Sequence, residues 1–142
     1  MRHLFCSIVL APLFLFATPH KYLGEFQSIV SSGSPCDSLF DEGKYQVQHF
    51  ITGPTHLTSV VYFQSENNKG FFNKVNLLGN NDGWGEMRVT REIIKDGFTF
   101  RVLADGLYDY GFLLLDLTVT AFKDLKQPAL CKTTSQFSAF DN

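Results

Sequence analysis

Two glutamates, Glu86 and Glu92, are the side chains of this sequence whose type and spacing come nearest to a catalytic pair. Some glycosidases use paired carboxylates as acid and nucleophile. In a strand these two residues would share a face, because successive side chains point to opposite sides. The alternate positions between them hold Arg88 and Thr90, which is more typical of a solvated charged face. No nucleophile elbow or phosphate-binding loop occurs, so we expect no enzymatic activity.

Aromatic residues in predicted connections are the candidates for ligand binding. Trp84 lies between two glycines, and Tyr108 and Tyr110 follow a later strand that ends near Asp105. An exposed Trp84 would offer a flat surface on which a sugar ring could stack. A tryptophan that opens a strand can equally fill the core, and the core interpretation is favoured. We therefore keep Trp84, Tyr108, Tyr110 and Asp105 as weak candidate ligand-binding residues.

Metal-ligating residue types are present but poorly grouped. The turn Asn80-Asn81-Asp82, with Asp105 or Asp109 nearby, has oxygen ligands that Ca²⁺ could use, although turn geometry alone explains Asn and Asp there. His49 lies on the apolar face of its predicted strand, which indicates a hydrogen-bonded core histidine, and His56 follows a turn. No His-x-His or Cys-x-x-Cys spacing occurs, so we expect no metal site and no cofactor.

The elements that must position these residues are predicted to be strands. Residues 86–94 and 98–105 alternate apolar and polar side chains, as half-buried antiparallel strands do. Lys95-Asp96-Gly97 between them is typical of a tight hairpin. Residues 110–123 begin with a continuous apolar run and then alternate, which predicts a central strand. Further strands are expected at 45–51, 57–64 and 73–78, and either a strand or a short helix at 26–30.

Six or seven regularly spaced strands without a convincing helix predict an all-β fold. For an exported chain we expect an antiparallel β-sandwich of jelly-roll type, with an immunoglobulin-like sandwich as the alternative. The cysteine–tryptophan–cysteine pattern of immunoglobulin domains is missing. With 142 residues, a net charge of −2 and no basic cluster, the chain is predicted to be one domain that does not bind nucleic acid.

The first seventeen residues have the pattern of a secretory signal peptide. Arg2 and His3 precede an apolar run from Leu4 to Ala17, and cleavage after Ala17 is expected. The alternative is an uncleaved signal anchor. We expect a secreted protein without membrane insertion after signal removal, a β-sandwich domain at 18–131 and a loosely held polar tail at 132–142.

Cysteine usage agrees with export. Cys6 lies in the predicted signal, which leaves Cys36 and Cys131 near opposite ends of the mature chain. This arrangement favours one intramolecular disulfide. Two free thiols or an intermolecular bridge are the alternatives.

The region from Tyr45 to Cys131 resembles a MAM domain, the extracellular adhesion module of meprins and receptor-type tyrosine phosphatases. The resemblance lies in the strand at 57–63, in Trp84, in the run Phe98-x-Phe100-x-Val102-x-Ala104-x-Gly106 and in the apolar strand at 111–119 that precedes the closing cysteine. Leu115 stands where that family has the first of two paired aspartates. The resemblance implies a jelly roll used for adhesion or protein recognition, without catalytic activity.

Two functions follow as hypotheses. The first is a secreted, non-enzymatic module that binds an extracellular protein and is MAM-like in outline. The second is a lectin-like jelly roll that binds a glycan through Trp84, Tyr108 and Tyr110. A change in Trp84 fluorescence with sugars would distinguish them.

Overall fold

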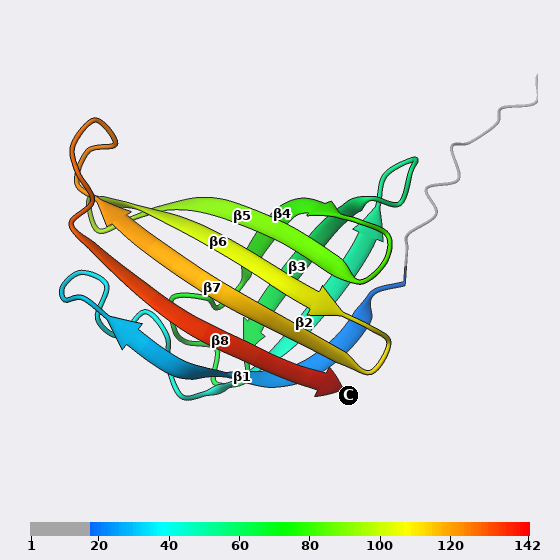
Figure 1. Ribbon diagram of the computed structural model, residues 1–142. Coiled ribbons are helices and arrows are strands. Elements are labelled where there is room, and N and C mark those ends of the chain that lie inside the picture. Colours follow the sequence, from blue (N-terminus) through cyan, green and yellow to red (C-terminus); the bar gives the residue numbers. More distant parts are fainter. Residues whose placement is uncertain (1–17) are drawn as a thin grey trace, which may run out of the picture.

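A computed structural model describes residues 18–142, and in it eight antiparallel strands close into a single barrel (Figure 1). Each strand pairs with the next one in the sequence, and β8 pairs back to β1. The predicted signal peptide at 1–17 lies outside the described residues. Within residues 18–142, no helix is long and apolar enough to cross a membrane.

The bounds of the eight strands follow the chain order. The strands are β1 (His20–Ser31), β2 (Lys44–Thr52), β3 (Thr58–Ser65), β4 (Val75–Asn81), β5 (Glu86–Lys95), β6 (Phe98–Tyr108), β7 (Phe112–Phe122) and β8 (Cys131–Asp141).

The all-β class is confirmed, but the expected jelly-roll sandwich is wrong, and so is the immunoglobulin-like alternative. Sandwiches and barrels both bury one face of each strand, so the alternation of apolar and polar residues is the same in both. The deciding element is β8, which bonds to β7 on one side and to β1 on the other. Its residues were expected to be a polar tail at 132–142. They instead form the strand that closes the sheet on itself.

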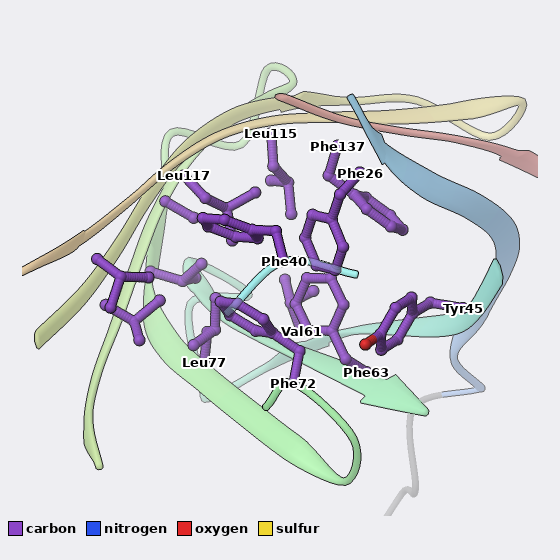
Figure 2. Close-up of a cluster of buried hydrophobic side chains, with 14 of the residues drawn as sticks. Phe26, Phe40, Tyr45, Val61, Phe63, Phe72, Leu77, Leu115, Leu117 and Phe137 are labelled. Carbon is purple, nitrogen blue, oxygen red and sulfur yellow. The ribbon is translucent and has the colours of Figure 1, made fainter. Parts of the chain in front are cut away.

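The barrel interior is filled with aromatic rings along part of its length. Phe26 of β1 lies at the centre of this cluster, with its ring centroid 4.9 Å from that of Phe40, 5.0 Å from Phe137 and 5.1 Å from Phe72. Figure 2 shows these side chains converging from several strands and connections. Aromatic pairs at this spacing stabilise the core beyond the area they bury. Five phenylalanines of the chain meet in this cluster, namely Phe26, Phe40, Phe63, Phe72 and Phe137.

One end of the barrel, which we call the plug end, is closed by two connections. The β1–β2 connection, residues 32–43, inserts Leu39 and Phe40, and the β3–β4 connection inserts Phe72; all three are buried. The predicted disulfide between Cys36 and Cys131 is confirmed, with a Cα–Cα distance of 5.9 Å. It fastens the first of these connections to the start of β8.

The opposite end, which we call the mouth, is formed by the start of β1 and by the β2–β3, β4–β5 and β6–β7 connections. Strands of an up-and-down barrel alternate in direction, so alternate connections emerge at the same end (Figure 1, right side). The mouth therefore gathers segments that are up to 90 residues apart in the chain, from His20 to Tyr110.

Candidate functional site at the barrel mouth

The mouth contains a cavity of about 760 Å³. That volume lies within the range of small-molecule sites, which often occupy the mouths of β-barrels. Aromatic, aliphatic and polar side chains line it together. The lining residues are His20, Ile51, Thr55, His56, Leu57, Asn81, Gly83, Trp84, Gly85, Glu86, Leu107, Tyr108, Asp109, Tyr110 and Phe112.

Three of the four candidate ligand-binding residues meet at this cavity. Trp84, Tyr108 and Tyr110 all line it, although Trp84 lies in the β4–β5 connection, Tyr108 ends β6 and Tyr110 lies in the β6–β7 connection. Trp84 is 92% exposed and Tyr110 is 78% exposed, so the core interpretation of Trp84 is wrong. Asp105 lies elsewhere, on the outer surface of β6, where its carboxylate forms a 2.6 Å salt bridge with Arg88.

The turn that carries Trp84 is held in place by Asp82. The Asp82 Oδ1 atom accepts hydrogen bonds from the backbone N–H of Trp84 at 2.7 Å and of Glu86 at 3.0 Å. These backbone N–H groups lower the pKa of Asp82. The glycines on either side of Trp84 have φ values of 77° and 121°, which side chains with a Cβ rarely adopt. The turn is thus fixed before any ligand arrives, with the indole directed outward.

Contacts between connections hold the tyrosines at the same rim. The backbone N–H of Tyr108 donates to the carbonyl of Gly85 at 2.8 Å, which joins the end of β6 to the Trp84 turn. The ring of Tyr110 packs edge-to-face on His20, with the centroids 5.0 Å apart. Three segments that are distant in sequence therefore form one continuous rim.

A hydrogen-bonded chain runs from the rim into the barrel. The N–H of Gly83 donates to Asn81 Oδ1 at 2.9 Å, which fixes the orientation of the amide. Asn81 Nδ2 then donates to Ser59 Oγ at 3.0 Å. Ser59 Oγ in turn shares a hydrogen bond with His49 Nε2, 2.9 Å away, in which the imidazole tautomer decides the donor. The predicted hydrogen-bonded core histidine is confirmed.

His49 is connected to the cavity through Tyr108, which lines it. It is fully buried, and its ring packs edge-to-face on that of Tyr108, with centroids 4.6 Å apart. Its Nδ1 atom has no hydrogen-bond partner among the described residues. Burial, reinforced by the neighbouring His20, lowers the pKa of His49 to about 4. The imidazole is therefore neutral at pH 7, as a buried group without a counter-charge must be.

The mouth is acidic. Its lining includes Glu86 and Asp109 and no lysine or arginine. Burial raises the pKa of Tyr22 to about 12, with further contributions from the charges of Asp141 and Asp109. Burial, followed by the charge of Asp82, also raises the pKa of Tyr108. The negative charges of nearby carboxylates therefore help to raise the pKa values of these two tyrosines at the mouth end of the barrel.

Two other arrangements suggested by the sequence do not form. Glu86 and Glu92 are six residues apart along β5, roughly 20 Å, and Glu92 forms a 2.8 Å salt bridge with Arg101. In the Asn80–Asp82 segment, Asn81 is buried beside Ser59 while Asp82 binds backbone N–H groups. No group of three or more His, Cys, Asp or Glu side chains in residues 18–142 is placed to hold a metal ion.

Several lining residues were not identified from the sequence. His20, Leu57 and Phe112 carry no motif, and His56 was expected only to be solvated. Glu86 was considered for a different chemistry. These residues could have been identified only from the strand order, because in an up-and-down barrel every second connection lies at the same end.

Comparison of the chain with protein-family models, with curated proteins and with solved structures returned no match, so the interpretation of the mouth depends on its own geometry.

Proposed function

We propose that this chain is a non-enzymatic binding protein whose ligand site is the barrel mouth and whose ligand is a small molecule with a flat apolar face. The observation that carries the proposal is Trp84, 92% exposed at the rim of a 760 Å³ cavity. A ligand that stacks on this ring would remove a large apolar surface from water, which is favourable. Tyr110 and Tyr108 beside it extend the same surface.

The rigidity of the rim supports binding over a purely structural role. Asp82 fixes the Trp84 turn, and a backbone hydrogen bond from Tyr108 to Gly85 joins that turn to the next connection. A site organised in advance loses little conformational entropy when its ligand arrives. Such a site can bind a small molecule with useful affinity.

The concave shape favours a small ligand over the protein partner expected first. The adhesion hypothesis came with the MAM-like resemblance and its jelly roll, whereas the chain forms a barrel with a hollow at one end. A glycan is a specific candidate, because sugar rings stack on exposed indoles and hydrogen-bond to carboxylates such as Glu86 and Asp109.

We also propose that the protein acts outside the cell. The support is the disulfide between Cys36 and Cys131, since such bonds persist in oxidising compartments. The predicted signal peptide agrees with it. Recovery of a protein lacking residues 1–17 from culture medium would test this part of the proposal, and retention of the full-length chain in cells would contradict it.

The binding site is tested by NMR on the isotope-labelled, oxidised protein, titrated with mixtures of ring-bearing sugars, carboxylic acids and amines. We expect the amide shifts that move to cluster in 83–86 and 108–112. A Trp84→Ala variant should weaken binding at least about tenfold, because it removes the ring with the largest contact area. Tyr62→Ala, which removes a ring from the outer face of β3, is the matched control. Shifts confined to the outer barrel surface, or none with any mixture, would overturn the proposal.

A further inference from the structure

We infer that the ligand of the mouth carries a positive charge, as an organic ammonium group packed against the aromatic rim. This inference rests on the proposed function and names the chemical class of the ligand. Three features of the mouth carry it: carboxylates that take part in neither salt bridge of the described residues, aromatic rings over which no described lysine or arginine lies, and a cavity large enough for the ligand.

The carboxylates of the mouth have no counter-ion within the described chain. Residues 18–142 form two salt bridges, and these use Asp105 and Glu92, both outside the cavity. The cavity lining contains Glu86 and Asp109 together with His20 and His56, but no lysine or arginine. Arg88, the arginine two residues from Glu86 on β5, is paired with Asp105. Asp109 is held in position, since its Oδ1 accepts the N–H of Tyr110 at 2.7 Å. A fixed negative potential favours a ligand of opposite charge.

The aromatic rings of the mouth lack the cations that rings elsewhere in the barrel already have. Within residues 18–142, Arg101 lies over the ring of Phe122 at 5.3 Å and Lys123 over that of Phe98 at 5.2 Å. No such cation lies over Trp84 or the tyrosines of the rim in the described part of the chain. Indole and phenol faces are the rings that attract ammonium groups most strongly, and several of them around one cation form a cage.

The cavity has room for more than a bare ammonium head. At about 760 Å³ it exceeds the space that a trimethylammonium group needs, and Leu57, Ile51 and Phe112 add apolar surface to the lining. These residues suit a hydrocarbon or aromatic body attached to the charge. A ligand that combines a cation with an apolar body would therefore contact both the carboxylates and the apolar lining of the cavity.

The test uses pairs of probes that differ in charge but hardly in shape. We would titrate the oxidised protein by calorimetry at low salt with choline and with its neutral isostere 3,3-dimethyl-1-butanol, and with phenethylamine and 2-phenylethanol. We expect each cation to bind roughly tenfold more tightly than its neutral partner. Affinity for the cations, and not for the alcohols, should fall when the salt concentration is raised.

A charge-removing variant gives the second readout. Glu86→Gln combined with Asp109→Asn should reduce the affinity for choline about tenfold and leave that for 3,3-dimethyl-1-butanol unchanged. Glu66→Gln, which makes a similar change in an exposed loop at the plug end, should alter neither. The salt dependence of the unaltered protein keeps the test decisive even if the double variant folds poorly.

The outcomes separate the two proposals. Equal or tighter binding of the neutral partners at the mouth would overturn the charge inference and leave the binding function standing. If neither member of either pair binds, and the broader NMR screen also finds no ligand at the mouth, both proposals fail. Preference for the cations with amide shifts that lie outside the mouth would also overturn the inference.

Discussion

His49 Nε2 lies 2.9 Å from Ser59 Oγ, and this contact is the inner end of the hydrogen-bonded chain that begins at the rim. The histidine is buried and neutral, with its pKa lowered from 6.5 to about 4. In the unfolded chain the same imidazole gains its proton as the pH falls through about 6.5. Between pH 6.5 and about pH 4, the unfolded state therefore binds one proton more than the folded state. The stability supplied by neutral His49 is therefore complete above pH 6.5 and is lost as the pH falls toward 4.

We expect this loss to reach roughly 3 kcal/mol in the free energy of unfolding between pH 7 and pH 4. Urea denaturation across that range measures it. Carboxylates titrate in the same window, so the informative quantity is the difference from a His49→Gln variant, which cannot titrate at this position. The variant should be less stable at pH 7 but less sensitive to acid. Parallel pH profiles for the two proteins would contradict the assignment.

The disulfide should contribute strongly to stability. Cys36 and Cys131 are 95 residues apart in sequence, and the chain-entropy model gives about 4–5 kcal/mol for closing so long a loop. Replacing both with serine should lower the free energy of unfolding by an amount of that order, and chemical reduction of the native protein should do the same. A Cys36→Ser, Cys131→Ser protein with unchanged stability would show that the plug end holds without the bond.

A methyl group at Gly79 should be very costly. A Cβ built there would lie 1.9 Å from the carbonyl oxygen of Arg88, a backbone atom of the adjacent strand β5 that cannot easily move. We expect Gly79→Ala to destabilise the barrel by more than about 3 kcal/mol. Gly111→Ala is the matched control, because a Cβ at Gly111 meets nothing within 4 Å. Thermal unfolding of the two variants makes the comparison, and equal melting temperatures would contradict it.

Phe40 should behave as a core residue although it lies in a connection between strands. Its ring is 5.1 Å from that of Phe72 and 4.9 Å from that of Phe26, at the centre of the plug end (Figure 2). We expect Phe40→Ala to cost about 3–5 kcal/mol of unfolding free energy, as truncation of a buried phenylalanine usually does. Phe140→Ala, at a position that is 62% exposed, should cost much less. Similar losses in the two variants would show that the connection does not plug the barrel.

The sequence indicated the individual strands well where alternation was regular. The pair 86–94 and 98–105 with its Asp96-Gly97 turn corresponds to β5 and β6, which pair from Glu86–Leu107 to Lys95–Phe98. The prediction from sequence was wrong at β8. The inward side chains at the start of that strand include Thr133 and Ser135, which are buried but polar. A polar inward face looks like a solvated tail in the sequence. Without β8, neither the closure nor the barrel could be inferred.

The site was partly predictable for the same reason. Trp84, Tyr108 and Tyr110 were recognised by residue type, and the barrel brings them together. Their neighbours His20 and Phe112 could not be recognised, since membership of the site depends on which end of the barrel each connection occupies. Asp105 alternates with inward-facing Ala104, so its side chain faces outward, toward Arg88 on β5. Residue type suggested the chemistry, but only the strand order determined the neighbours.

The ring of eight paired strands also restricts how a partner protein can recognise this chain. Open sheets present backbone N–H and C=O groups along an edge strand, and a second protein can bind there by adding a strand of its own. Each strand of this barrel has a neighbour on both sides, so no strand is open along its whole length. The ladders are incomplete only where neighbouring strands diverge, as in the second half of β5, where Arg91–Lys95 pair with β6 but not with β4. A macromolecule that binds the barrel wall therefore contacts mainly side chains, and sheet growth between copies could begin only at such short unpaired segments.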